Sequence, residues 1–174
     1  MSYFIAEVSS NHSRDLGRAL EFVEVAADIG CDAVKFQLFK IDKLFAAEIL
    51  SKSENHRNRQ NWELPLEFLP YIAERCKKRG IHFSCTPFYL DAVAELEPFV
   101  DFYKIASYEL LWDGLHSLCA QTGKPVMIST GMAEMPEIIH AVNVLKSNGC
   151  DEPTVLHCTS AYPTPYREAN LAAI

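Results

Sequence analysis

The chain has 174 residues, of which 49% are hydrophobic and 22% are charged, a length that suits one domain with a sizeable core. Its seven glycines and nine prolines exclude a collagen-like or low-complexity protein, and the apolar fraction excludes general disorder. The formal net charge of −7 argues against a protein that binds nucleic acid by neutralising phosphates, so we expect no nucleic-acid partner.

The N-terminal segment has no basic residues ahead of its apolar run and reaches Glu7 early, which indicates a buried strand rather than a signal peptide. No apolar run approaches the ~20 residues that a membrane span needs, so we expect no membrane association.

No CxxC pair occurs, and the cysteines lie in apolar segments, which predicts reduced thiols in a cytoplasmic protein. His157 beside Cys158 is weak evidence for a metal, because two adjacent ligands lack a third.

Short β-rich runs alternate with amphipathic stretches along the whole chain. The predicted strands are Tyr3–Val8, Ala33–Phe39, His82–Thr86, Phe102–Ala106, Val126–Thr130 and Thr154–Thr159. Apolar residues at i, i+3 and i+4 spacing predict helices over Leu16–Ile29, Pro65–Arg79, Leu90–Leu96, Leu111–Gln121 and Pro136–Ser147. Four of these helices are followed by a glycine, which is typical of helix C-termini.

This alternation predicts an α/β fold with a parallel sheet and right-handed crossovers. Polar residues gather at the C-terminal ends of all six strands, which is where (β/α) barrels of the TIM type carry their chemistry. A doubly wound open sheet is the alternative, but no GxGxxG follows the first strand, so a dinucleotide-binding fold is disfavoured.

Six strands correspond to about six of the eight βα units of a full barrel, which takes ~250 residues. We therefore interpret residues 1–174 as the N-terminal part of a barrel, with no second domain in this chain. In an unclosed barrel the first and last strands would be unpaired edges. We then expect a set of inward side chains to meet water, namely Phe4, Val34, Phe36, Ile105, Ile128 and Leu156.

The connection from Lys40 to Glu63 is long and polar, with a short helix predicted near Phe45–Lys52. Over the catalytic face such a segment is either a lid or a solvated excursion, and the sequence leaves both open.

Several strand ends carry residue types that could do chemistry. Glu7 lies in an apolar run, where a carboxylate is costly to bury unless paired, and it is either functional or part of a structural ion pair. Lys35 and Gln37 share one face of their strand, and an inward lysine needs an anionic partner. Lys104 and Glu109 flank a third strand end and offer a cation and a proton-transfer group.

Other motifs have ordinary structural explanations beside functional ones. Ser10–His12 could simply turn the chain and cap a helix, and His157 could be a satisfied core histidine. Ser129-Thr130-Gly131 lets backbone N–H groups approach an anion, although many strand-to-helix turns look similar. The loop Tyr162–Tyr166 is either a rigid turn or an aromatic wall. Taken together, two lysines, several hydroxyls and two carboxylates suit a small, polyanionic, oxygen-rich substrate.

Six segments taken in chain order resemble the N-acetylneuraminate (sialic acid) synthase family. They are FIAEVSSNH, AVKFQLFK, FSCTPF, YKIASYEL, GKPVMISTGM and LHCTSAYPTPY, and the resemblance covers essentially the whole chain. It implies a (β/α)₈ barrel followed by a small antifreeze-like domain. It also implies a transferase that condenses phosphoenolpyruvate with an N-acylated hexosamine, such as N-acetylmannosamine, to give a sialic-acid-type nonulosonate and phosphate.

The resemblance also implies roles for individual residues. Glu109 resembles the family's central acid/base, and Glu7 is a second catalytic candidate. The implied phosphoenolpyruvate ligands are Lys35, Thr86, Lys104, Ser107, Ser129 and Ser160. The implied sugar-facing residues are Glu7, Gln37 and Tyr162.

The family uses a divalent metal, Mn²⁺ or Mg²⁺, whose histidine ligands lie on the seventh and eighth strands, so we expect no metal ligand in this chain and little activity from it alone. Family members form homodimers, which we expect here too.

Two other functions stay open on the residues alone. One is a Schiff-base aldolase or lyase using a lysine such as Lys104, and the other is a non-catalytic truncated barrel that acts in assembly or anion binding.

Overall fold

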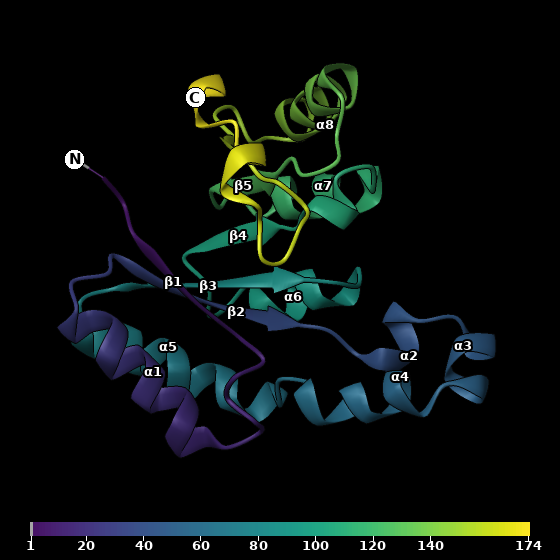
Figure 1. Ribbon diagram of the computed structural model, residues 1–174. Coiled ribbons are helices and arrows are strands. Elements are labelled where there is room, and N and C mark those ends of the chain that lie inside the picture. The colour runs from purple at the N-terminus through teal and green to yellow at the C-terminus, as the bar shows by residue number, and fades with distance from the viewer. Residues whose placement is uncertain (1) are drawn as a thin grey trace. The chain divides into compact units, whose positions relative to one another are not determined.

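The computed structural model describes residues 2–174 of the chain (Figure 1). The chain divides into two compact units, Met1–Asp101 and Phe102–Ile174. Each unit contains three parallel β-strands and the helices that connect them.

In the first unit the strands pair in the order β1 (Ile5–Ser9), β2 (Ala33–Leu38) and β3 (His82–Pro87). Helices α1 (Leu16–Asp28) and α5 (Leu69–Arg79) lie side by side along these strands (Figure 1), and α6 (Asp91–Leu96) follows β3. Outside the connection between β2 and α5, this order of strands and helices confirms the prediction, although β1 begins and ends later than the predicted Tyr3–Val8.

The ends of α1 and α5 follow from local chemistry. The Asp15 carboxylate accepts a hydrogen bond from the Arg18 N–H at 2.9 Å and caps the start of α1. Helix α5 begins at Leu69, preceded by the 3₁₀ turn η2 (Leu66–Phe68), so the predicted start at Pro65 is too early. Pro70 explains the shift, because proline is tolerated in the first turn of a helix but not further inside it. Gly80 ends α5 with a φ of 70°, the left-handed conformation that favours glycine.

In the second unit the parallel order is β4 (Phe102–Ile105), β5 (Val126–Ser129) and β6 (Thr154–Leu156). Helices α7 (Asp113–Gln121) and α8 (Met135–Ser147) pack on each other, and α8 begins with a reciprocal capping box between Glu134 and Glu137. The 3₁₀ turns of this unit are η3 (Ser107–Glu109), η4 (Tyr166–Glu168) and η5 (Leu171–Ala173).

Strand β6 is shorter than predicted, since it ends at Leu156 rather than Thr159. The residues after it bond to the C-terminal segment instead of continuing the strand. The His157 ring nitrogen Nε2 lies 2.8 Å from the Ala169 carbonyl oxygen, and the Thr159 hydroxyl donates to the Glu168 carbonyl at 3.4 Å. His157 is exposed, so its interpretation as a core histidine is wrong.

The expectation that Val34, Phe36, Ile105 and Ile128 meet water is wrong, because all four side chains are fully buried. Successive side chains of a strand point to opposite faces, so the neighbours of Lys35 turn away from the lysine. The Phe36 ring packs edge-on against Phe83 with centroids 6.0 Å apart. Two other residues of the predicted set differ from these four: Phe4 is exposed and Leu156 is half-buried.

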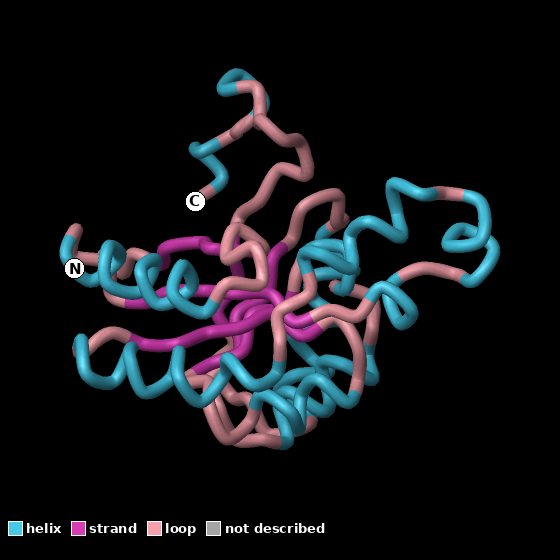
Figure 2. The backbone as a smooth tube through the Cα atoms, turned by 90° about the horizontal axis from the view of Figure 1, so that it is seen from below, coloured by secondary structure: helices cyan, strands magenta, loops and turns pink. Residues whose placement is uncertain are grey.

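The connection after β2 is far more helical than predicted. It forms α2 (Ile41–Leu44), α3 (Ala47–Lys52), α4 (Glu54–Asn58) and the 3₁₀ turn η1 (Arg59–Trp62), where the sequence predicted one short helix. Figure 2 shows this run of cyan turns extending from the strands. Helices of four to six residues are too short to produce a recognisable apolar period, which explains why they escaped prediction.

All six cysteines are free thiols, and burial raises the pKa of both Cys76 and Cys119 to about 12. These two thiols are therefore inert at neutral pH, as expected for reduced core cysteines. Across residues 2–174, no helix combines the length and the apolar content that crossing a bilayer requires.

Candidate functional site

In the second unit, three strand ends converge on Gly131. The Gly131 N–H donates to the Ser107 hydroxyl oxygen at 3.1 Å, which joins the end of β4 to the end of β5. The Ser160 hydroxyl, from the segment after β6, lies against the same glycine. A Cβ atom at position 131 would clash with Ser160 Oγ and would stand 3.0 Å from Ser107 Oγ. Gly131 is therefore required for close approach, and it gathers two of the predicted hydroxyls at one point.

Ser129 belongs to the same group. It is buried at the end of β5, and the Cys158 thiol donates to its hydroxyl oxygen at 3.2 Å. The adjacent Thr130 hydroxyl donates to the Leu156 carbonyl at 2.9 Å and fixes the turn after the strand. Hydroxyls and a backbone N–H at the end of parallel strands form a cradle suited to anionic oxygens.

Glu109 closes the 3₁₀ turn η3 that follows β4. Burial raises the pKa of its carboxyl group to about 7, and the Lys104 ammonium opposes part of this rise. Its Oε2 atom is buried and has no hydrogen-bond partner among the described residues. A carboxyl group with a pKa near 7 can both give and take a proton at neutral pH, which is the requirement for a general acid/base. Lys104, on β4, is half-buried.

In the first unit, Lys35 is buried and forms an ion pair with Glu7, while its Nζ atom lies 3.3 Å from the Thr86 hydroxyl oxygen. These three residues come from β2, β1 and β3, so the parallel register brings them together. The other oxygen of the Glu7 carboxylate, Oε1, accepts from the Ser9 N–H at 2.9 Å. Glu7 thus joins the lysine to the turn after β1.

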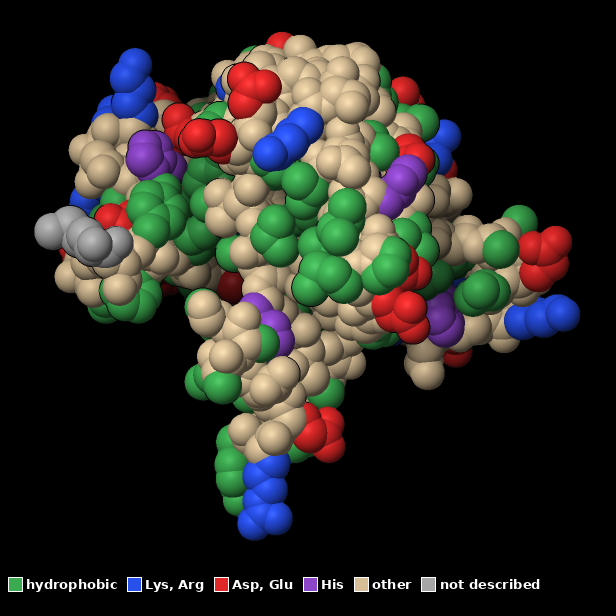
Figure 3. All heavy atoms as spheres, turned by 90° about the horizontal axis from the view of Figure 1, so that it is seen from above, with side chains coloured by type: hydrophobic (Ala, Val, Ile, Leu, Met, Phe, Trp, Pro, Cys, Tyr) green, Lys and Arg blue, Asp and Glu red, His purple; other side chains and the backbone are tan. Residues whose placement is uncertain are grey.

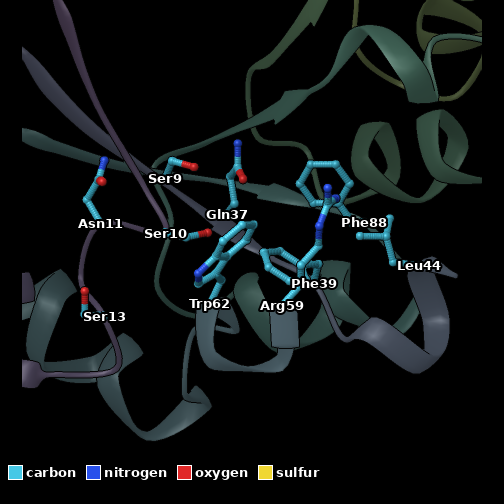
Figure 4. Close-up of a pocket in the computed structure, with 10 residues that line it drawn as sticks. All are labelled: Ser9, Ser10, Asn11, Ser13, Gln37, Phe39, Leu44, Arg59, Trp62 and Phe88. Atoms are coloured by element: carbon cyan, nitrogen blue, oxygen red, sulfur yellow. The ribbon is translucent and has the colours of Figure 1, made fainter. Parts of the chain in front are cut away.

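Gln37 lies two residues beyond Lys35 on the same face of β2 and lines a cavity of about 550 Å³. Polar side chains of the β1–α1 turn form one wall of this cavity, and residues of β2, α2, η1 and the segment after β3 form the rest (Figure 4). The cavity lies wholly within the first unit.

Tyr162 is not brought into either group, since its side chain is 94% exposed. The remaining predicted site residues fall into two groups, one in each unit. Glu7, Lys35, Gln37 and Thr86 belong to the first unit, and Lys104, Ser107, Glu109, Ser129 and Ser160 belong to the second.

Residues 2–174 contain no group of three or more His, Cys, Asp or Glu side chains placed to hold a metal ion. His157 and Cys158, the adjacent pair noted in the sequence, are each engaged in a hydrogen bond. The described part of the chain does not supply a complete ligand set for the divalent metal that the resemblance implies.

Sequence reasoning missed Arg59 and Trp62, which line the cavity from the polar connection. The sequence does contain a hint of a role for Trp62, because it is one of two tryptophans in the chain and lies in an otherwise polar stretch. The position of these side chains depends on the fold of the short helices, so the pattern alone could not place them.

Comparison with known families adds a decisive observation, since the model of the NeuB family matches residues 22–174. The chain belongs to the NeuB family. It is 37% identical over 98% of its length to an N,N'-diacetyllegionaminic acid synthase of Campylobacter jejuni, covering 55% of that protein. It is 32% identical over 99% of its length to a pseudaminic acid synthase of the same species, covering 53% of that protein.

Among solved structures, the N-acetylneuraminic acid synthetase of Leptospira borgpetersenii superposes with a TM-score of 0.88 at 32% identity. The match covers 99% of this chain and 59% of that one. The fold class is therefore α/β of the (β/α)-barrel type, with part of the barrel present, as the sequence predicted. The chain spans about half the length of the curated relatives that it matches.

Proposed function

We propose that this NeuB-family chain supplies the phosphoenolpyruvate-binding and acid/base groups of a sugar-acid synthase. In this reaction phosphoenolpyruvate condenses with an N-acylated hexosamine and water to give a nonulosonate and inorganic phosphate. The observation that carries the proposal is the convergence at Gly131 of Ser107 and Ser160, beside the buried Ser129. Hydroxyls and a backbone N–H in this arrangement suit the oxygens of a phosphate or carboxylate group.

Each group of residues has a role in the proposed reaction. Lys104 and the Gly131 cradle, all in the second unit, hold the anionic oxygens of phosphoenolpyruvate. C3 of phosphoenolpyruvate attacks the aldehyde carbon of the sugar, forming the new C–C bond while the aldehyde oxygen takes up a proton. Water then adds at C2, and the C2–O bond to phosphate breaks. Glu109 moves the proton at one of these steps, since its pKa of about 7 suits both directions of transfer.

The test is phosphate release by the complete protein supplied with phosphoenolpyruvate, an N-acylmannosamine and Mn²⁺. We expect release to require both substrates. Release without the sugar, or a pyruvate adduct trapped by borohydride on a lysine, would instead support the Schiff-base lyase alternative. Anion binding without turnover would support the non-catalytic alternative.

The homodimer, the metal dependence and the cytoplasmic location implied by the resemblance remain part of this proposal. Light scattering of the complete protein tests the dimer, and chelation followed by readdition of Mn²⁺ or Mg²⁺ tests the metal. Cell fractionation tests the location.

A further inference from the structure

The Cys158 thiol lies at the Gly131 cradle of the second unit. It donates to the hydroxyl oxygen of Ser129 at 3.2 Å, and the Ser129 residue is 5% exposed. The ring of the adjacent His157 has a different partner, because its Nε2 atom lies 2.8 Å from the Ala169 carbonyl oxygen. The thiol and the imidazole therefore act separately, and the partner of the thiol is a hydroxyl of the cradle.

The pairing of β5 with β6 brings Cys158 to this place. Ser129 stands opposite Leu156 in the parallel register. The Thr130 hydroxyl donates to the Leu156 carbonyl at 2.9 Å and holds the end of β6 against the turn after β5. Cys158 follows Leu156 by two residues, so this register and this bond place its thiol beside Ser129.

The cradle can hold an anion only if its hydroxyls donate to it. A hydroxyl group has one O–H donor and two lone pairs that accept. The oxygens of an ionised phosphate or carboxylate accept only, so a hydroxyl binds them through its O–H alone. An O–H that points at a protein acceptor is lost to the anion. The direction of each O–H therefore decides how well the cradle binds.

Two hydroxyls of the cradle share one arrangement. The Ser107 oxygen accepts from the Gly131 N–H at 3.1 Å. The Ser129 oxygen accepts from the Cys158 thiol. In both cases a protein donor occupies a lone pair of the oxygen and turns the O–H toward another partner. A hydroxyl that accepts a hydrogen bond is also polarised into a better donor, so both serines are prepared to bind an anionic oxygen.

We propose that Cys158 is a positioning residue of the anion site, whose thiol holds the Ser129 oxygen so that the Ser129 O–H donates to phosphoenolpyruvate. Cys158 acts through Ser129 and does not itself bind the substrate. Sulfur is a weak acceptor, so the thiol does not draw the Ser129 proton away from the anion. This inference rests on the proposed function and deepens it by adding a residue to the phosphoenolpyruvate site.

The first test is calorimetric titration of the complete protein with phosphoenolpyruvate. Cys158→Ala should weaken binding by about fivefold, which corresponds to one hydrogen bond of ~1 kcal/mol. Cys158→Ser keeps a donor and should bind within about twofold of the wild type, because the bound anion selects the orientation in which the new hydroxyl donates to Ser129. In steady-state assays, Cys158→Ala should raise KM for phosphoenolpyruvate much more than it changes kcat or KM for the sugar.

Cys31→Ala is the matched control, because Cys31 is another half-buried free thiol and belongs to the first unit. It should bind phosphoenolpyruvate as the wild type does. A lower melting temperature of Cys158→Ala with unchanged affinity would show that the thiol only packs, and would overturn the inference. Equal losses of affinity in Cys158→Ala and Cys158→Ser would also overturn it, since donation would then be irrelevant.

The second test uses the wild-type protein and so does not depend on the folding of a variant. N-ethylmaleimide alkylates free thiols, and mass spectrometry of peptides follows the rate at each cysteine. Phosphoenolpyruvate should slow the alkylation of Cys158 and leave that of Cys31 unchanged, because an anion on Ser129 covers a thiol 3.2 Å from its oxygen. Equal rates at Cys158 with and without phosphoenolpyruvate would contradict the inference.

These outcomes separate the inference from the proposed function. If phosphoenolpyruvate binding depends on Cys158 but no phosphate is released when the sugar is added, the synthase proposal fails and the inference stands. If phosphate is released but Cys158→Ala binds phosphoenolpyruvate as the wild type does, the inference fails and the synthase proposal stands. Failure of the wild-type protein to bind either phosphoenolpyruvate or inorganic phosphate would overturn both.

Discussion

At the scale of single residues, Glu109 is the group whose environment most clearly departs from that of an ordinary surface carboxylate. Its buried Oε2 atom lacks a protein partner among residues 2–174, and burial raises its pKa to about 7. The unfolded chain binds a proton at Glu109 only below a pKa of ~4.3, so the folded state holds more protons between these values. The contribution of Glu109 to stability is therefore complete below about pH 4 and is lost as the pH rises through about 7.

Glu109→Gln should lower kcat of the complete protein by ~10²–10⁴-fold, with a much smaller change in KM, because an amide keeps the shape but cannot exchange the proton. It should also remove the pH dependence near 7 from the rate profile and flatten the fall in melting temperature between pH 5 and pH 8. Stopped assays and thermal melts across this range check both effects. A variant that keeps more than about half of the wild-type kcat would exclude Glu109 from acid/base catalysis.

Gly131→Ala should weaken phosphoenolpyruvate binding, because the added Cβ would push the Ser107 and Ser160 hydroxyls apart. Two displaced charge-assisted contacts, at ~1.5–3 kcal/mol each, correspond to a loss of at least ~100-fold in affinity. Calorimetric titration of the complete protein with phosphoenolpyruvate measures the loss. Ser117→Ala, on α7, is a small-residue control outside the cradle, and wild-type affinity in Gly131→Ala would contradict the assignment of the cradle.

At the scale of elements, α1 and α5 are joined by a buried apolar seam and by ions at its edge. Ala19, Val23 and Ala26 of α1 are buried, as are Leu69, Ile72 and Cys76 of α5. Glu24 on α1 accepts from both Arg75 and Arg79 on α5, and Arg79 also bonds to Asp28. The hydrogen bond from Arg79 is the main reason that the pKa of Glu24 is lowered.

A lowered carboxyl pKa stabilises the folded state above the unfolded pKa, and this stabilisation is lost as the pH falls through the folded pKa. Glu24→Gln should therefore lower the melting temperature at pH 7, with a smaller effect at pH 3 and in 1 M salt. Differential scanning calorimetry checks this. Glu74→Gln breaks an i,i+4 pair with Lys78 within α5 alone, so it should have less effect; an equal loss from both variants would contradict the view that Glu24 links the two helices.

The elements that sequence analysis predicted best are those whose apolar period is long. Helix α1 was predicted to within one residue, because its buried side chains recur over 13 residues. The helices between Ile41 and Asn58 escaped, since none is long enough to show a period. The strand pattern also located Lys35, Gln37 and Glu109, because they lie at or just after the ends of predicted strands. Arg59 and Trp62 lie in a segment without a periodic pattern, so the sequence did not single them out. Orientation was the other failure: Val34 and Phe36 were assigned to the face of Lys35, although a strand's period of two places them opposite.

At the scale of the whole molecule, the chain leaves many large apolar side chains in contact with solvent. Figure 3 shows hydrophobic side chains gathered on one face. Among residues 2–174, the most exposed large apolar side chains include Ile29, Tyr108, Tyr162, Tyr166 and Ile174. Surfaces of this kind mark sites that are covered by other protein, and they promote association when left bare.

The polypeptide of residues 1–174, produced by itself, should bind a hydrophobic dye and self-associate, because covering these side chains removes apolar surface from water. Light scattering over a range of protein concentrations and dye fluorescence measure the two effects. The N,N'-diacetyllegionaminic acid synthase of Campylobacter jejuni, of which this chain covers 55%, serves as the control and should bind less dye. A dilute monomer of residues 1–174 that melts sharply and binds no dye would contradict this expectation.

The Glu7 carboxylate connects Lys35 to the turn that lines the cavity. Its carboxylate is shared, with one oxygen on the Lys35 ammonium and the other on the N–H of Ser9, in the turn that lines the cavity. An anion that binds at Lys35 competes with Glu7 for the ammonium charge. A shift of the Glu7 carboxylate would change its hydrogen bond to the Ser9 N–H. By thermodynamic linkage, the factor by which a ligand in the cavity changes the affinity for the anion equals the factor by which the anion changes the affinity for that ligand. Titration of one ligand in the presence of the other therefore measures how strongly Glu7 couples the two positions.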